Sequence, residues 1–239
     1  MKIDVMGVHF DNVTMDEALE QGTALLDTEG ASVCVTPNSE IVYEAIHDEE
    51  FRALLNSAEL VLPDGAGVVL GAKILKTPLK QKVAGIDFAA GMLKIFAQRG
   101  TPLYLLGGKP GVADLAAEKM RRLAPGLDIC GTADGYFTEE APVVEAINAS
   151  GAQALFVCLG APKQERFMFA HKNELQVRFM AGLGGSLDGF AGTVKRAPQW
   201  MIRLQLEWLY RLIKEPKRLG RMMRLPKFVL ATLAKRIKG

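Results

Sequence analysis

Residues 102–132 read PLYLLGGKPGVADLAAEKMRRLAPGLDICGT, and this stretch indicates the fold of the chain. Its two apolar runs, PLYLLGG and LDICGT, are typical of strands, and the intervening PGVADLAAEKMRRLA carries apolar residues at helical spacing. A strand, a helix and a second strand in this order form a βαβ unit with parallel strands. Because strands this continuously apolar are buried on both faces, helices are expected on both sides of the sheet.

The same alternation continues on either side of this unit. Further strand-like runs are SVCVTPN, ELVLPDG, ALFVCLG and VRFMAGLGG. Helical segments include DEEFRALLNSA and PVVEAINASG, and a capping box of Thr14 and Glu17 opens the first long helix, MDEALEQGTALLDTE. The pattern predicts an α/β fold with a mostly parallel, Rossmann-like sheet that has helices on both faces. With 239 residues, of which 49% are hydrophobic, the chain suffices for one such domain plus an appendage.

The pattern changes near Gly192, after which no strand is predicted. An apolar stripe then recurs at helical spacing, formed by Trp200, Leu204, Trp208 and Leu212. Pro216 and Pro226 are expected to divide this segment into about three helical pieces. We therefore expect an α/β body over residues 1–194 and a basic, amphipathic, membrane-associating helical appendage over residues 195–239.

Charge divides along the same boundary. The chain has 29 Lys and Arg against 27 Asp and Glu, but residues 195–239 hold 13 of the basic and 2 of the acidic ones, a local net charge of +11. Such a segment suits an anionic partner, and charge alone leaves nucleic acid, anionic lipid and a diphosphate substrate open. The aromatic and Met residues between the basic ones favour a helix lying on an anionic membrane surface.

Sequence features also bear on location and metal content. No apolar run reaches the roughly 18 residues of a spanning helix, and the opening MKIDVMGVHFDN lacks the layout of a signal peptide. A cytoplasmic location is therefore expected. Cys34, Cys130 and Cys158 have no CxxC spacing and are expected to be free thiols. Neither cysteines nor histidines show a metal-ligand pattern, so no metal and no cofactor is predicted.

In an open parallel sheet, ligands bind beyond the carboxyl ends of the strands, so the residues that follow each strand are candidate site residues. Asp64 lies between Pro63 and Gly65 directly after a predicted strand. There its carboxylate could accept a proton from an incoming hydroxyl. It could also cap the helix predicted for GAGVVLGAKIL, and the two roles are compatible.

Other polar residues follow neighbouring strands. Thr36 and Asn38 could bind a sugar or phosphate, or close an Asx-type turn. Gln164 falls in a first helical turn, where an outward amide could contact ligand or simply be solvated. Asp188 could bind a ribose or a base edge, or stabilise its own glycine-rich turn.

A diphosphate ligand would meet cations rather than a metal ion in this chain. No Asp-x-Asp pair is present, as a metal-dependent glycosyltransferase would need, so Arg, Lys and helix N-termini would have to balance phosphate charge. Arg211, Arg218 and Arg221 of the appendage are candidates. The loop GGKPG, with Asp128 about twenty residues on, leaves a nicotinamide-dependent oxidoreductase as a minor alternative, although its spacing departs from GxGxxG.

Six separated motifs carry a family resemblance. They are TPNSE (36–40), LPDGAGVV (62–69), GYF (135–137), LGAPKQE (159–165), GLGGSLDGFAG (182–192) and RAPQW followed by LEWLYRLIKEPKR (within 196–218). In this order, and over nearly the whole chain, they resemble the WecG/TagA/CpsF family of bacterial glycosyltransferases. The resemblance implies an inverting, metal-independent transfer of N-acetylmannosamine from its UDP-activated form.

The acceptor that the resemblance implies is undecaprenyl-diphosphate-linked N-acetylglucosamine, at the cytoplasmic face of the plasma membrane. The reaction would be an early step in the synthesis of wall teichoic acid or a related surface polysaccharide. Because the family also includes enzymes that use mannosaminuronate or glucose donors, another UDP-sugar remains open. A peripheral membrane association is implied, a homo-oligomer is compatible with the apolar tail, and nucleic acid is not an expected partner.

The resemblance also implies roles for individual residues. Asp64 resembles the general base of the family. Thr36, Asn38 and Gln164 resemble its donor-site groups, and Asp188 and Tyr136 are similar to residues that line the nucleotide pocket. The appendage would close over the site and bring its cations onto the diphosphate, namely Arg211, Arg218 and Arg221.

Overall fold

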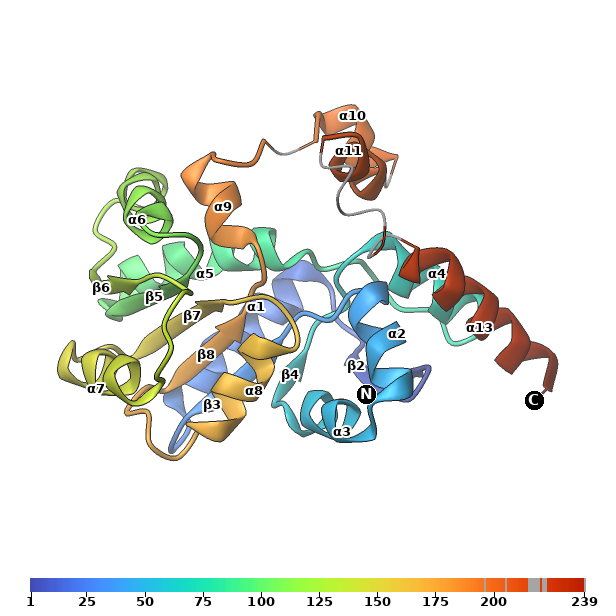
Figure 1. Cartoon of the computed structure of the whole chain (residues 1–239), viewed down its shortest axis with the longest axis horizontal. Coiled ribbons are helices and arrows are strands. Elements are labelled where there is room, and N and C mark those ends of the chain that lie inside the picture. The colour runs from blue at the N-terminus through green and yellow to red at the C-terminus, as the bar shows by residue number, and fades with distance from the viewer. Residues whose placement is uncertain (196, 205, 215–219, 221–222, 239) are drawn as a thin grey trace.

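The computed structural model describes residues 1–195, 197–204, 206–214, 220 and 223–238. Its centre is a six-stranded, all-parallel sheet, which confirms the α/β prediction (Figure 1). The strand order is β4-β3-β8-β7-β5-β6. The strands are β3 (Ser32–Val35), β4 (Leu60–Val61), β5 (Leu103–Gly107), β6 (Ile129–Ala133), β7 (Ala154–Cys158) and β8 (Phe179–Gly182). Each of them overlaps one of the six apolar runs that predicted a strand.

Helices cover both faces of this sheet, as predicted. One apolar core lies under α1 (Met15–Ala24), α5 (Gly85–Arg99), α6 (Val112–Leu123) and α9 (Ser186–Ala191). The other lies under α2 (Ser39–His47), α3 (Glu49–Ser57), α7 (Ala141–Ala149) and α8 (Lys163–Ala170). Successive strand residues alternate between the two cores: Leu103 and Leu105 face the first, and Leu106 faces the second. The sheet is thus buried on both sides, which explains its continuous apolar runs.

The N-terminal part holds an element beyond the parallel sheet. Strands β1 (Lys2–Val5) and β2 (Val8–Asp11) form an antiparallel hairpin, and their buried residues join the core that also contains α4 (Ala66–Ile74). The predicted capping box is confirmed, since the backbone N–H of Glu17 donates to Thr14 Oγ1 and that of Thr14 donates to the Glu17 carboxylate. Helix α1 ends at Ala24, earlier than expected, and a 3-10 turn (Leu25–Asp27) follows it.

The tail contains α10 (Gln199–Arg203), α11 (Glu207–Lys214) and α13 (Arg224–Lys238). The predicted break at Pro226 is wrong, because Pro226 is the third residue of α13. In a first helical turn the backbone N–H has no intrahelical acceptor, so proline is tolerated there. Pro216 lies outside the described residues. None of the described helices is both long and apolar enough to cross a bilayer.

Helix α13 packs against α2 and α4 (Figure 1). Its Phe228 is fully buried, and a Cβ added to Gly71 of α4 would lie 2.7 Å from the Phe228 ring. Arg224 adds an ion pair to Glu44 of α2 at 2.7 Å. The last helix is therefore part of the packed core beside α2 and α4, whereas Trp200 and Leu204 in α10 and its C-cap remain 60% and 62% exposed.

We expect Phe228→Ala to lower the free energy of unfolding by about 3–5 kcal/mol, since it removes a fully buried aromatic ring. Urea denaturation followed by circular dichroism measures this loss. Leu230→Ala on the same helix is the matched control, and because Leu230 is 65% exposed the change should stay within about 0.5 kcal/mol. Equal midpoints for the two variants would show that α13 does not pack as described.

Candidate active site

The polar residues expected at strand ends do lie along one edge of the sheet, at the carboxyl ends of its parallel strands. Along the edge, Asp64 follows β4, Thr36 follows β3, Gly184 follows β8, and Lys109 and Tyr136 follow β5 and β6. Because β4 and β6 are the two outer strands, Asp64 and Tyr136 lie near opposite ends of this edge.

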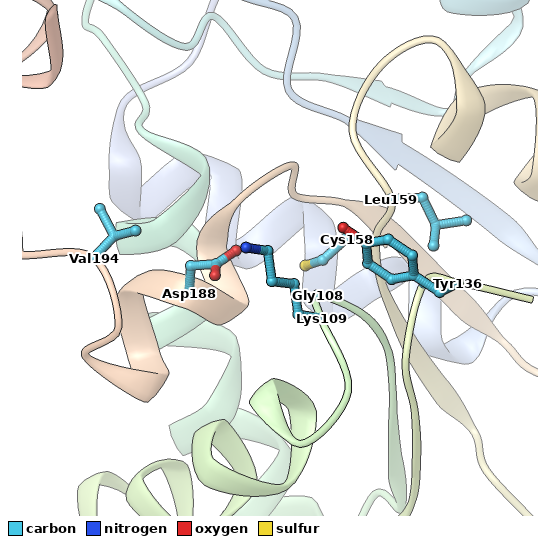
Figure 2. Close-up of a pocket in the computed structure, with 8 residues that line it drawn as sticks. Gly108, Lys109, Tyr136, Cys158, Leu159, Asp188 and Val194 are labelled. Carbon is cyan, nitrogen blue, oxygen red and sulfur yellow. The ribbon is translucent and has the colours of Figure 1, made fainter. Parts of the chain in front are cut away.

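A cavity of about 430 Å³ opens at the β7-β5-β6 end of the edge. Figure 2 shows the Lys109 side chain extending toward Asp188, with the Tyr136 ring on the other side of the opening. Burial raises the pKa of the Cys158 thiol at the base of the cavity to about 12, so this group is neutral. The cavity thus offers an exposed aromatic ring, one cation and one carboxylate, which suit a nucleoside with attached phosphate.

Glycine shapes the floor of this cavity. Gly107, at the end of β5, has a φ of +133°, and a Cβ added there would lie 2.3 Å from the Cys158 carbonyl oxygen. Only glycine allows the two strand ends to approach so closely. The close approach of β5 to β7 therefore explains why the first residue of the GGKPG loop is glycine. Within the described part of the chain, no group of three or more His, Cys, Asp or Glu side chains is arranged to hold a metal ion.

Of the two roles that the sequence left open for Asp188, the contact within its own turn is observed, and the side chain also lines the cavity. Asp188 Oδ1 accepts a hydrogen bond from the Thr193 hydroxyl at 3.2 Å. Tyr136 also lines the cavity, with 68% of its surface exposed. Its loop is held from α8, because the Lys163 ammonium donates to the Gly135 carbonyl oxygen and lies 4.2 Å from the centre of the Phe137 ring.

Asp64 is half-buried in the loop between β4 and α4. The alternative role of Asp64 as the N-cap residue is wrong, because Gly65 is the N-cap residue of α4 and has no side chain with which to cap it. The φ of Gly65 is +87°, in the region that favours glycine. Gly65 lies beside Asn38, since a Cβ added to Gly65 would be 3.6 Å from the Asn38 Cβ. On the other side of Asp64, the Pro63 carbonyl oxygen accepts from the Val83 backbone N–H at 2.9 Å. The backbone of Asp64 is therefore flanked by the hydrogen-bonded Pro63 on one side and the N-terminus of α4 on the other.

Thr36 and Asn38 are both engaged in structural hydrogen bonds. The Thr36 hydroxyl donates to the Gly182 carbonyl oxygen at 2.8 Å and so joins the ends of β3 and β8. Asn38 is the N-cap residue of α2, and its Oδ1 accepts from the backbone N–H groups of Glu40 and Ile41 at 2.9 and 3.1 Å. The turn-forming alternative is thus observed for Asn38.

Gln164 is not the outward amide that was expected, and it is not a solvated surface residue either. It is 2% exposed, and both ends of its amide are used. Its Oε1 accepts from the Gly184 backbone N–H at 2.9 Å, and its Nε2 donates to Glu165 Oε1 at 2.8 Å. Glu165 was not predicted as a site residue. Its polar surroundings, APKQER, are typical of an exposed turn, and no local signal marks its burial.

The ends of β3 and β8 lie between Asp64 and the cavity. Adjacent strands are about 4.8 Å apart, so β4 and β7 are separated by about 14 Å, with β3 and β8 between them. Beyond β8, Gly184 and Gly185 leave open space, since no atom lies within 4 Å of a Cβ added to either. An elongated ligand could lie over these glycines, with one end in the cavity and the other at Asp64.

The basic tail approaches this site through α11. Lys82 and Glu207, both less than 20% exposed, form an ion pair at 3.1 Å. Lys82 immediately precedes Val83, whose N–H binds Pro63 beside Asp64. The helix that contains Arg211 is therefore tied to the segment next to Asp64. The side chain of Arg211 and the whole of Arg218 and Arg221 lie outside the part of the chain that the structure describes.

Comparison with known proteins adds the family context. A model of the glycosyl transferase WecG/TagA/CpsF family matches residues 3–239. A relative from Bacillus spizizenii is 39% identical over 88% of this chain and 82% of its own length. A Staphylococcus aureus relative is 33% identical over 99% and 95%, respectively. Both relatives are named N-acetylglucosaminyldiphosphoundecaprenol N-acetyl-beta-D-mannosaminyltransferase.

Proposed function

Because this chain belongs to the WecG/TagA/CpsF family of glycosyl transferases, we propose that it transfers N-acetylmannosamine from a UDP-activated donor to undecaprenyl-diphosphate-linked N-acetylglucosamine. The observation that carries the donor and acceptor assignment is the near full-length similarity to enzymes named for this transfer. The oxidoreductase and nucleic-acid alternatives have no support from these relatives. The product would enter the synthesis of wall teichoic acid or a related surface polysaccharide.

In this proposal the cavity binds the nucleotide end of the donor. The exposed Tyr136 ring stacks on the base, and Asp188 accepts hydrogen bonds from the sugar hydroxyls of the nucleoside. Lys109, on the same cavity, lies where a cation can meet the first phosphate. The diphosphate and the transferred sugar then extend over Gly184 and Gly185 toward Asp64.

The transfer is a single displacement at the anomeric carbon. Asp64 takes the proton of the acceptor hydroxyl, the acceptor oxygen bonds to the anomeric carbon, and the bond from that carbon to the diphosphate oxygen breaks. One displacement inverts the anomeric configuration. The departing UDP gains negative charge, which Arg211, Arg218 and Arg221 of the tail would stabilise. Thr36 and Gln164 hold the backbone at and after the end of β8, Asn38 caps α2, and none of the three needs to change its present bonds.

A lipid-linked acceptor requires the site to work at a membrane surface. Trp200, Leu204 and Trp208 are exposed apolar residues of the tail, among basic residues such as Arg203 and Lys214. This combination favours peripheral binding to an anionic bilayer, at the inner face of the plasma membrane. The apolar face would enter the lipid boundary and present the cavity edge to the acceptor.

A transfer assay tests this proposal. The purified protein is incubated with a short-chain lipid-diphosphate-N-acetylglucosamine and, in separate reactions, with UDP-N-acetylmannosamine, UDP-N-acetylmannosaminuronate and UDP-glucose. We expect a disaccharide product with the first donor at a rate at least tenfold above the others. Transfer from one of the other two donors would support the reaction class and overturn the donor assignment. If none of the three donors gave a product, both the reaction class and the donor assignment would be overturned.

Gly185→Ala tests the path of the donor. The φ of Gly185 is −84°, which alanine adopts without strain, and its added methyl group meets no protein atom. We therefore expect an unchanged melting temperature and a donor KM raised about tenfold, equivalent to about 1.4 kcal/mol, because the methyl group occupies space that the donor needs. An unchanged donor KM would place the donor elsewhere on the edge.

A further inference from the structure

Glu165 is a buried carboxyl group for which the mechanism above has no use. It is 1% exposed in the first turn of α8, and its Oε2 has no hydrogen-bond partner among the described residues. Burial raises its pKa to about 7, and the nearby Glu44 carboxylate adds to the rise. The Arg224 guanidinium forms its ion pair with Glu44. A carboxyl group as poorly solvated as that of Glu165 lowers stability, so its presence calls for a functional reason.

The hydrogen bond between Glu165 and Gln164 determines how the neighbouring amide is oriented. Glu165 Oε1 accepts from Gln164 Nε2 at 2.8 Å. Whether the carboxyl group is ionised or carries a proton on the unpartnered Oε2, its Oε1 is an acceptor, so it holds the NH₂ group of Gln164 toward itself and leaves the Gln164 Oε1 on the opposite side. That oxygen accepts from the Gly184 backbone N–H. If the amide rotated by half a turn, its NH₂ group would face that N–H, and two donors would oppose each other.

Gly184 belongs to the segment over which the donor must pass. Three of the hydrogen bonds that hold this segment come from outside its own turn: Gly182 O accepts from the Thr36 hydroxyl, the Leu183 N–H donates to Val157 O, and the Gly184 N–H donates to Gln164. The first two come from neighbouring strand ends. The third is accepted by the Gln164 amide, whose orientation depends on the titratable side chain of Glu165. Neither of the other two bonds involves an acceptor that a titratable side chain orients.

We infer that Glu165 is a positioning residue, which orients the Gln164 amide so that the Gly184–Gly185 backbone is held as the floor of the donor path. This inference rests on the proposed function for the identity of the ligand, but the contact itself is independent of it. Glu165 has no direct contact with donor or acceptor in this arrangement, since it is almost completely covered by protein.

Two substitutions separate positioning from a general structural role. Glu165→Met keeps the length of the side chain and removes the acceptor. Replacing a buried charge by an apolar group of similar volume is often neutral or stabilising, so this variant is expected to fold. Glu165→Gln keeps an acceptor oxygen for Gln164 and should behave as the wild type. Met168→Leu, a volume-conserving change in the same helix, is the packing control.

The first readout is amide hydrogen exchange measured by NMR, which needs no substrate. In Glu165→Met the Gly184 amide is expected to exchange at least tenfold faster than in wild type, while the amide of Met180 in β8 is unchanged. In Glu165→Gln and Met168→Leu, exchange at Gly184 should stay within threefold of wild type. Unchanged exchange at Gly184 in Glu165→Met would overturn the inference.

The second readout is the split between donor KM and kcat. We expect Glu165→Met to raise donor KM and the UDP dissociation constant about tenfold, with kcat within threefold, and Glu165→Gln to restore both constants. A variant with faster Gly184 exchange and unchanged UDP affinity would overturn the link between this turn and the donor. If wild type itself bound no UDP, the proposed function would fail, whereas the exchange result would still decide whether Glu165 orients Gln164.

Discussion

Asp64→Asn is expected to lower kcat for sugar transfer about 10²- to 10⁴-fold, the range typical of a lost general base. The change keeps the size of the side chain and replaces a proton acceptor by an amide that cannot take the proton. Because Asp64 lies about three strand spacings from the nucleotide cavity, the dissociation constant of UDP should stay within threefold of wild type. Steady-state kinetics and isothermal titration calorimetry measure the two quantities.

Asp27→Asn is a suitable control for this experiment. Asp27 precedes β3 and pairs with Arg99, which precedes β5, so the pair lies at the opposite edge of the sheet. An exposed ion pair of this kind contributes little to stability, and transfer should be unaffected. Full activity of Asp64→Asn, with Asp27→Asn also active, would remove Asp64 as the base.

Arg211→Ala is expected to lower kcat about 10²- to 10³-fold. Other enzymes show a loss of this size when one group that stabilises charge in the transition state is removed. Arg211→Lys should recover only part of this loss, because lysine cannot make the paired hydrogen bonds of a guanidinium to phosphate. The measurement uses a short-chain, water-soluble acceptor, so that a change in membrane binding does not lower the rate.

Arg203→Ala in α10 is the matched control for Arg211→Ala, since it removes a cation from the same tail and should leave turnover of the soluble acceptor unchanged. Point substitutions are preferable to deletion of residues 195–239. Deletion would also remove Phe228 and Thr232, which are fully buried against the body, and would lower stability. Wild-type turnover by Arg211→Ala would contradict the proposed role of α11 over the site.

The fold could be predicted because its six parallel strands are buried on both faces. Such strands form short, continuous apolar runs, and the intervening helices show the 3.6-residue period. The location of Asp64 at a strand end followed directly from this pattern. Its alternative as a helix cap could not be excluded in advance, because the sequence did not show that Gly65, with its positive φ, would begin α4.

The orientation of Gln164 could not be predicted for a different reason. Its burial depends on Gly184, twenty residues away, and on the neighbouring Glu165 carboxyl group. Polar residues in a first helical turn are typical of the surface, and only the three-dimensional contact reverses this expectation. The same holds for α13, whose Phe228 fits against Gly71 of α4, a contact to which the tail sequence gives no signal.

We expect the chain to perform an inverting transfer without a metal ion, and the product formed in the presence of a chelator decides this. The protein is incubated with UDP-N-acetylmannosamine and lipid-diphosphate-N-acetylglucosamine in excess EDTA, and the anomeric configuration of the product is determined by NMR. The proposal predicts undiminished transfer and a product inverted relative to the donor. Transfer that stops in EDTA and returns with a divalent cation, or a product that retains the donor configuration, would contradict it.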